Sequence, residues 1–224
     1  MRYYFFVTSR ELHSAISRLK VEYRSWKTPA VTIVAQCEQS PFKVLVSCII
    51  SLRTKDEVTA LASKRLFDRA ATPEAMQLLP VDEVARLIYP AGFYRNKAQQ
   101  IVDISRRLVT EYEGRVPDSI EALLTFRGIG RKTANLVLTL GYDKQGICVD
   151  THVHRICNRW GYVSTRTPDA TEMALRAKLP PEYWIEINDL LVAFGQNHCH
   201  PVSPRCSTCC LYDICRREGV AVSR

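Results

Sequence analysis

The chain has 224 residues, and 46% of them are hydrophobic, so it can bury a sizeable core in one large domain or two smaller ones. Its formal net charge is +8, which favours a polyanionic partner, with nucleic acid ahead of an anionic membrane. No apolar stretch reaches the roughly 18 residues of a membrane span, and the apolar run Tyr3–Val7 is too short for a signal peptide. We therefore expect an intracellular protein that makes no membrane contact.

Signals for helix starts recur along the whole chain, and apolar residues follow them at helical spacing. One late stripe, from Ile187 to Phe194, is followed by Gly195, which we expect to be its C-cap. No convincing alternating strand appears, so the sequence predicts an all-α fold of about eleven helices. The start signals stand at Thr54 with Glu57, Thr72 before Pro73, Asn96, Asp118 with Glu121, Asp150, and Thr167 before Pro168.

A glycine-rich turn lies between two of the expected helices. Residues 123–136 read LLTFRGIGRKTANL, in which the turn Gly128–Gly130 is followed by a helix that begins near Arg131. Glycines let backbone amides approach an anion, and a helix N-terminus adds its dipole, so this turn is suited to hold a phosphate. A plain corner between two helices is the alternative. Lys132, two residues after the turn, favours the phosphate site. Ile129 either packs inward or presses on a sugar backbone.

Asp150 follows the apolar residues 147–149 and precedes an expected helix. An N-cap is a common and sufficient explanation for an aspartate at such a place. The other interpretation is a catalytic carboxylate that the helix N-terminus keeps ionised. His152 and His154 could contact phosphate, although a packed or surface histidine explains each of them as well.

Four of the nine cysteines cluster near the C-terminus with the spacing C-x6-C-x2-C-x5-C. Four soft thiolates this close can surround one metal centre, and both zinc and iron–sulfur centres accept such a set. Zinc sites usually pair two C-x2-C knuckles, whereas only one is present, so the spacing favours an iron–sulfur cubane. Cys210 is interpreted as a bystander. The predicted ligands are Cys199, Cys206, Cys209 and Cys215, and the predicted core thiols are Cys37, Cys48, Cys148 and Cys157.

The string GIGRKTAN, then VDTH, then the cysteine spacing resembles the endonuclease III family of helix–hairpin–helix DNA glycosylases. The likeness covers most of the chain, from Pro41 to Cys215. It implies a two-lobed helical fold with a DNA cleft between the lobes. One lobe is a six-helix barrel of residues 34–144, and the other, of residues 1–33 and 145–224, holds a [4Fe–4S] cluster on the four cysteines.

The resemblance also implies the roles of individual residues. By position, Lys132 matches the family's nucleophile and Asp150 its catalytic aspartate. The adenine-excising branch of the family lacks this lysine. The chain therefore resembles the bifunctional branch, which removes oxidised pyrimidines and cleaves the strand by β-elimination through a lysine Schiff base. The expected DNA contacts are Arg53, Phe93, Gly128, Ile129, Gly130, Arg131, His152 and Arg205.

Several residues depart from the family pattern. Arg53 stands where the family usually has a glutamine that fills the gap left by the flipped base, and Phe93 replaces a leucine that wedges into the duplex. Arg127 replaces a proline before the hairpin. Arg205 is the single fixed cation between the first two cluster cysteines, fewer than is usual. These departures leave lesion preference and opposite-base preference open.

The expected partner is double-stranded DNA with a damaged or abasic site, bound by a monomer. In a bacterium or archaeon the protein would be cytoplasmic and associated with the nucleoid. Arg53 keeps open a thymine or uracil mismatch glycosylase of the same fold. Two further alternatives are a non-enzymatic DNA-binding protein whose cluster senses redox state and an RNA-binding zinc protein.

Overall fold

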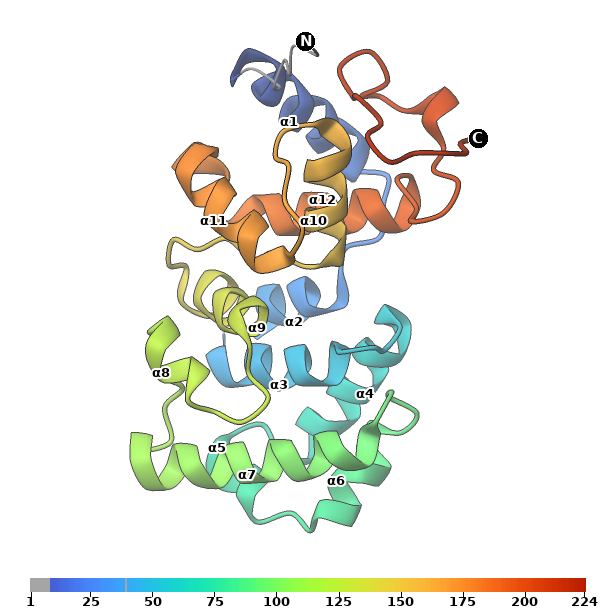
Figure 1. Ribbon diagram of the computed structural model, residues 1–224. Coiled ribbons are helices and arrows are strands. Elements are labelled where there is room, and N and C mark those ends of the chain that lie inside the picture. The colour runs from blue at the N-terminus through green and yellow to red at the C-terminus, as the bar shows by residue number, and fades with distance from the viewer. Residues whose placement is uncertain (1–8, 39) are drawn as a thin grey trace. The chain divides into compact units, whose positions relative to one another are not determined.

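The structure is a computed structural model that describes residues 9–38 and 40–224 (Figure 1). The run Tyr3–Val7 lies outside this part. The described residues contain helices and no strand, and no described helix is long and apolar enough to cross a membrane. The α-helices are α1 (Ser9–Tyr23), α2 (Ala30–Glu38), α3 (Pro41–Ser51), α4 (Asp56–Arg69), α5 (Pro73–Gln77), α6 (Val81–Ile88), α7 (Tyr94–Tyr112), α8 (Ile120–Leu124), α9 (Arg131–Leu136), α10 (Thr151–Trp160), α11 (Pro168–Lys178) and α12 (Glu186–Asn197). The shorter turns are η1 (Val137–Gly141, a π-helix), η2 (Pro181–Tyr183) and η3 (Cys206–Thr208).

The chain divides into two compact units. We call Pro29–Gly146 the hairpin unit, and Met1–Thr28 together with Ile147–Arg224 the cysteine unit. The hairpin unit extends a few residues at both ends beyond the lobe of residues 34–144 that the family resemblance implies. The second unit is discontinuous in sequence.

Helix α3 is the central helix of the hairpin unit. Its N-cap Ser40 accepts a hydrogen bond from the backbone N–H of Lys43 at 3.4 Å, and Pro41 occupies the first turn, where a missing N–H costs nothing. Every residue from Phe42 to Ile50 is buried, because α3 contacts α2, α4, α7, α9 and η1. The helix is therefore buried on every side, and Lys43 and Ser47 are the polar residues among its buried ones.

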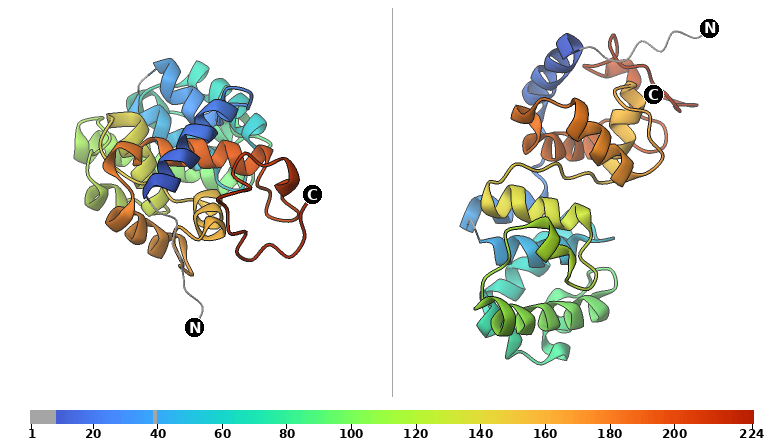
Figure 2. Two further views of the ribbon diagram at one scale, coloured as in Figure 1. Left: turned by 90° about the horizontal axis from the view of Figure 1, so that it is seen from above. Right: turned by 60° about the vertical axis from the view of Figure 1, so that its left-hand side comes forward.

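The predicted apolar stripe on α12 and a second stripe on α10 form much of the core of the cysteine unit. Helix α1 covers this core with Leu12, Ile16 and Leu19, and it lies beside the C-terminal segment in both figures (Figures 1 and 2). Arg18 of α1 donates one hydrogen bond to the carbonyl of Cys210 at 3.0 Å and one to Asp213 at 2.6 Å. These contacts hold the C-terminal segment against the helical core.

The caps that consist of threonine before proline are confirmed. Thr72 accepts from the N–H of Ala75 at 3.3 Å, and Thr167 accepts from the N–H of Ala170 at 3.2 Å. The core-thiol interpretation is also confirmed for the described members, since Cys48, Cys148 and Cys157 are buried. The side chain of Cys37 lies outside the described part of the chain.

Two predicted capping boxes are wrong. Helix α4 begins after Lys55, and Thr54 instead accepts hydrogen bonds from Gly92 and Lys97. The cap of α8 is Ser119, because the carboxylate of Asp118 pairs with Lys144 at 2.5 Å, outside the helix. In both cases a partner distant in sequence captures the polar group.

Two other helix ends differ from their predicted positions. Helix α7 begins at Tyr94, before Asn96. Gly195 is not a C-cap, since α12 continues to Asn197. Glycine is required there for space, because a Cβ would lie 2.2 Å from Nδ1 of His152.

Candidate functional site

The turn Gly128–Gly130 joins α8 to α9 in the hairpin unit, as predicted. Gln100 of α7 holds it through its side-chain amide, which donates to the carbonyl of Arg127 at 3.0 Å. Gly128 has φ +78°, and a Cβ there would lie 2.7 Å from the Gln100 amide nitrogen. The positive φ favours glycine at this position, and the Gln100 amide would have to move to admit a Cβ.

The remaining residues of the turn leave the start of α9 accessible. Gly130 is the N-cap of α9 and provides no side-chain cap, and a Cβ there would meet nothing within 4 Å. The first N–H groups of a helix have no intrahelical acceptor, so this end favours an anion. The side chain of Ile129 packs inward with 6% exposed. The backbone is therefore the part of the tip that a ligand can contact.

Lys132 lies in the first turn of α9, half-buried, with Arg131 before it. Its positive charge acts on the thiol of Cys48 on α3: burial raises the pKa of Cys48 to about 12, and Lys132 opposes that rise. Asn135 stiffens the helix by donating to the carbonyl of Arg131 at 3.0 Å. The π-helical turn η1 follows directly, and such turns occur often at functional sites.

Asp150 is the N-cap of α10 in the cysteine unit, as the simpler interpretation predicted. Its Oδ1 accepts the backbone N–H groups of His152 at 2.8 Å and Val153 at 2.9 Å, and the residue is 8% exposed. Both capping bonds use Oδ1, so Oδ2 takes no part in the cap. The cap and a catalytic role are compatible, because one oxygen orients the carboxylate while the other stays available to a substrate.

The two histidines after Asp150 have contacts inside the cysteine unit. His152 Nδ1 lies 3.2 Å from a guanidinium nitrogen of Arg155, and His154 Nδ1 lies 2.7 Å from the hydroxyl of Thr171. Each ring therefore has a polar neighbour within the cysteine unit.

Arg53 and Phe93 lie together in the hairpin unit. Both are exposed, both have positive φ, and the guanidinium of Arg53 lies 5.6 Å from the ring centroid of Phe93. Lys97, which the sequence analysis did not single out, is buried beneath their loops. Its sequence signal is weak, because a lysine near a helix start is ordinarily solvated.

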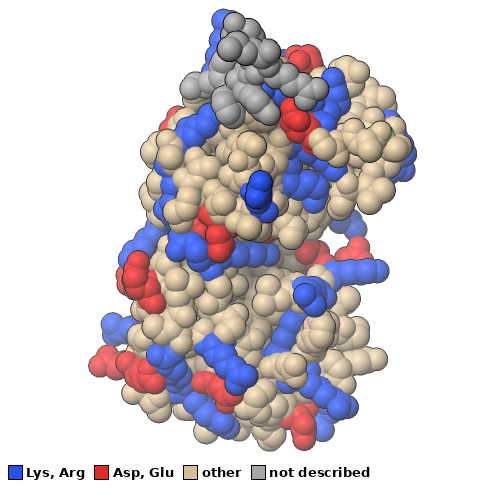
Figure 3. All heavy atoms as spheres, in the orientation of Figure 1, with Lys and Arg blue, Asp and Glu red and all other residues tan. Residues whose placement is uncertain are grey.

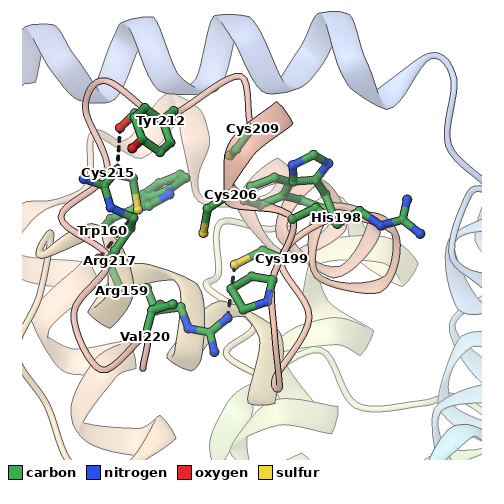
Figure 4. Close-up of a pocket in the computed structure, with 13 residues that line it drawn as sticks. Arg159, Trp160, His198, Cys199, Cys206, Cys209, Tyr212, Cys215, Arg217 and Val220 are labelled. Carbon is green, nitrogen blue, oxygen red and sulfur yellow. Dashed lines mark hydrogen bonds between the residues drawn. The ribbon is translucent and has the colours of Figure 1, made fainter. Parts of the chain in front are cut away.

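The four predicted cysteine ligands line one cavity of about 380 Å³, part of which is open solvent (Figure 4). His198, Arg159, Trp160 and Phe194 also line it, whereas Cys210 is not among its lining residues. Within residues 9–38 and 40–224, no group of three His, Cys, Asp or Glu side chains is arranged to hold a metal ion. The structure thus brings the four cysteines around a shared space rather than onto a single point.

Two arginines of α10 hold the first part of the cysteine segment. Arg159, which is 8% exposed, donates to Cys199 Sγ at 3.4 Å and to the carbonyls of His200 and Pro201 at 2.6 Å each. Arg155 donates to the carbonyl of Cys199 at 2.8 Å. Arg159 was not predicted from the sequence. Its signal was a charged residue next to the apolar stripe of α10.

The donor set around the cavity fits a sulfur-ligated centre. Burial raises the pKa of Cys199, and it raises that of Cys215 to about 11, so without a bound cation these thiols hold their protons at neutral pH. The imidazole Nε2 of His198 is buried without a hydrogen-bond partner. Four sulfur atoms and an unpaired polar nitrogen surround one space. A thiolate-bound polar group in that space would use the sulfurs as ligands and could accept a hydrogen bond from the nitrogen.

Comparisons with known proteins identify relatives of this chain. Residues 46–181 match the HhH-GPD superfamily of base excision DNA repair proteins. Endonuclease III of Thermotoga maritima is 50% identical over 185 residues, which cover 81% of this chain and 87% of that protein. Endonuclease III homolog 1 of Arabidopsis thaliana, a chloroplastic protein, is 45% identical, and the aligned region covers 78% of this chain and 48% of that longer protein.

Solved structures give the same result. The fold matches a trapped endonuclease III–DNA covalent intermediate with a TM-score of 0.83 and 29% identity, covering 95% of this chain and 97% of that one. A thermostable thymine-DNA glycosylase matches with a TM-score of 0.71 and 22% identity, over 90% of this chain and 97% of that one, and shows likeness of fold alone. The predicted all-α helix–hairpin–helix glycosylase fold is therefore confirmed. The chain belongs to the endonuclease III family of the HhH-GPD superfamily, the base-excision DNA glycosylases that also act as abasic-site lyases.

Proposed function

We propose that the protein acts as a monomer on double-stranded DNA, removing an oxidised pyrimidine and then cleaving the strand, with Lys132 as the nucleophile and Asp150 as the catalytic carboxylate. The observation that carries this proposal is the position of Lys132 in the first turn of α9, directly after an open glycine turn. If the turn holds a backbone phosphate, the amine of Lys132 lies near the sugar of the neighbouring nucleotide.

The reaction begins with displacement of the damaged nucleotide from the base stack, which costs a few kcal/mol and least for a damaged or mismatched base. The neutral amine of Lys132 then attacks C1′ of the sugar, and the bond from C1′ to the base breaks. The C1′–O4′ bond of the sugar ring then breaks, which gives the imine between Lys132 and C1′. A proton leaves C2′ and the bond from C3′ to its phosphate oxygen breaks, so the 3′ phosphate departs. The strand is cut on the 3′ side of the lesion.

Asp150 would stabilise the positive charge that develops on the sugar as the base leaves. Its Oδ1 is fixed by two backbone N–H groups, so the carboxylate is oriented before the substrate arrives. A group already oriented toward developing charge needs no reorganisation during the reaction. Oδ2 can then assist the proton transfers.

DNA affinity would rest on phosphate contacts. The turn Gly128–Gly130 would bind one phosphate through its backbone, and Arg131, His152 and Arg205 would contact others. Lys and Arg side chains are spread over the face drawn in Figure 3 and interspersed with acidic ones. Contacts from such Lys and Arg side chains to phosphates would be independent of the base sequence.

Arg53 and Phe93 would occupy the space that the displaced nucleotide leaves. Phe93 is 61% exposed, and an exposed aromatic ring can stack on a base. Arg53 would donate hydrogen bonds to the base left unpaired on the opposite strand.

A [4Fe–4S] cluster is the proposed cofactor, held by Cys199, Cys206, Cys209 and Cys215. When bound, it supplies Fe–S bonds that cross-link a segment with little helix of its own. The reaction steps above need no electron transfer. Arg155 and Arg159 orient the first ligand by binding the backbone around it.

The second candidate is a thymine or uracil mismatch glycosylase, which Arg53 favours because arginine suits an orphan guanine. A panel of duplexes, each with one lesion opposite each of the four bases, separates the two. Excision and strand cleavage at oxidised pyrimidines support the proposal. Excision restricted to thymine or uracil opposite guanine, without strand cleavage, contradicts it.

A further inference from the structure

Lys97 is a buried charged residue that the reaction proposed above does not use. It lies on α7 with 5% of its surface exposed, and burial lowers its pKa to about 8. A lysine is almost never buried to this extent unless its ammonium group has partners. The partners therefore indicate what the residue does.

The ammonium group of Lys97 bonds the end of α3 and the loop that follows. Nζ donates to the carbonyls of Ile50 at 2.8 Å and Leu52 at 2.5 Å, and to the hydroxyl of Thr54 at 2.9 Å. The last carbonyls of a helix lack intrahelical donors, so a cation is favourable at this end. Two of these bonds fix the backbone before Arg53, and the third fixes the side chain of the residue after it.

Thr54 joins this loop to the turn that carries Phe93. Its hydroxyl oxygen also accepts the backbone N–H of Gly92 at 3.0 Å. A Cβ on Gly92 would lie 2.5 Å from the carbonyl oxygen of Arg53, so the two backbones are in direct contact. Two loops distant in sequence thus form one hydrogen-bonded body around Lys97.

Arg53 and Phe93 project from this body in unusual backbone conformations. Their φ angles are +53° and +58°, in the left-handed region that residues other than glycine rarely adopt. Such conformations persist only where the surroundings enforce them. The guanidinium lies against the aromatic ring, so the two exposed side chains form a preassembled pair.

We propose that Lys97 is a positioning residue for base displacement, which holds Arg53 and Phe93 as one rigid pair that enters the duplex without further ordering. Groups ordered before binding lose less conformational entropy on binding, so the pair opens the duplex more effectively than two mobile side chains would. This inference rests on the proposed function. It assigns Lys97 to the opening of the duplex and not to the breaking of bonds.

The test compares two substrates. One is a fully paired duplex with a lesion, and the other carries the same lesion in an unpaired bubble, where no paired base has to be displaced. Lys97→Met keeps the aliphatic stem and removes the three hydrogen bonds. We expect it to lower kcat/KM on the paired duplex about tenfold, the scale of a slightly misplaced group, and to leave kcat/KM on the bubble unchanged. Equal losses on both substrates would indicate a merely structural role and overturn the proposal.

Lys43→Met is the matched control. Lys43 is a second buried lysine of the hairpin unit, lying 5.5 Å from the ring of Phe67 and away from the two loops. In this variant, the ratio of kcat/KM on the paired duplex to kcat/KM on the bubble should stay at the wild-type value. A ratio that falls as far as in Lys97→Met would contradict a specific role for Lys97.

A double variant tests whether Lys97 acts through the pair. Phe93→Ala should lower the same ratio, and adding Lys97→Met should cause little further loss, because the pair that Lys97 holds is already broken. A further loss of about tenfold on adding the second change would mean independent effects and overturn the proposal.

If Lys97→Met folds poorly, Thr54→Val removes the hydroxyl that joins the loops and should lower the ratio in its place. An unchanged ratio in folded Thr54→Val overturns the proposal. Failure of the proposed function has a different signature, since the wild type would then excise from neither substrate.

Discussion

The glycine turn Gly128–Gly130 and the segment of residues 199–215 are both irregular, but different forces hold them. The turn lies between two helices, packs Ile129 inward, and needs one side-chain bond from Gln100. The cysteine segment contains a single 3-10 turn and is held by arginines distant in sequence. A turn that its own glycines and a single bond from α7 hold should survive most changes elsewhere. A segment held by long-range contacts and a cofactor should not.

The largest expected effect comes from breaking the cysteine segment. Cys199→Ser should lose the yellow-brown colour and most of the expected irons, about four per chain, and the cysteine unit should fold poorly because a structural metal site contributes folding free energy. Hydrogen exchange should show lost protection in residues 199–215 and retained protection in α3. Iron analysis and visible absorbance measure the cofactor.

Cys210→Ser is the control for this prediction, since Cys210 is outside the cavity lining. It should keep its iron and its colour. Colourless wild-type protein containing one zinc ion would contradict the proposed cofactor.

The next effect separates the two roles of Asp150. Asn caps a helix about as well as Asp, so Asp150→Asn should keep the fold of α10 while removing the negative charge. Base excision should fall by about two to three orders of magnitude, and DNA binding should hold or tighten because a carboxylate near phosphates is gone. Single-turnover kinetics and a binding titration measure the two quantities. If the folded variant excises the base at the wild-type rate, Asp150 acts only as the N-cap of α10.

A smaller effect is expected at the turn itself. Arg131→Ala should weaken binding to all duplex sequences alike and reduce the slope of log K against log salt by about 0.9, the value for one phosphate contact. Titrations at several salt concentrations measure the slope. If the slope stays at the wild-type value, Arg131 contacts no phosphate.

The smallest effect concerns specificity. Arg53→Gln should flatten the preference among opposite bases, which a bidentate contact to guanine sets at about 1–3 kcal/mol, and should leave cleavage of abasic sites largely intact. Excision rates opposite each of the four bases measure this. If the wild type excises the lesion equally well opposite all four bases, Arg53 does not contact the opposite base and has only a packing or phosphate role.

The caps show which features can be predicted from sequence. Thr72 and Thr167 cap as predicted, because each bonds an N–H three residues away in its own helix. Thr54 and Asp118 match the same pattern, but Lys97 and Lys144 bind them from other parts of the chain. A local pattern states what a polar group can do, and tertiary structure decides which partner it takes.

The site residues follow the same division. Asp150 was predicted from a local motif, and its capping geometry is local. Arg159 and Lys97 were not predicted, because each bonds carbonyls of a segment remote in sequence. Every residue has a backbone carbonyl, so the amino-acid pattern does not show which carbonyls need such a partner. Buried charged residues that serve remote backbone therefore become visible only in the folded structure.

The central claim, that Lys132 is the nucleophile, is tested most directly by borohydride reduction during reaction with abasic DNA. The wild type should yield a covalent protein–DNA adduct, because reduction fixes the imine between Lys132 and C1′. Lys132→Gln should yield no adduct and no strand cleavage while it still binds DNA, since one charge among many contributes little to affinity. Undiminished trapping by Lys132→Gln, or no trapping by the wild type, would contradict the assignment.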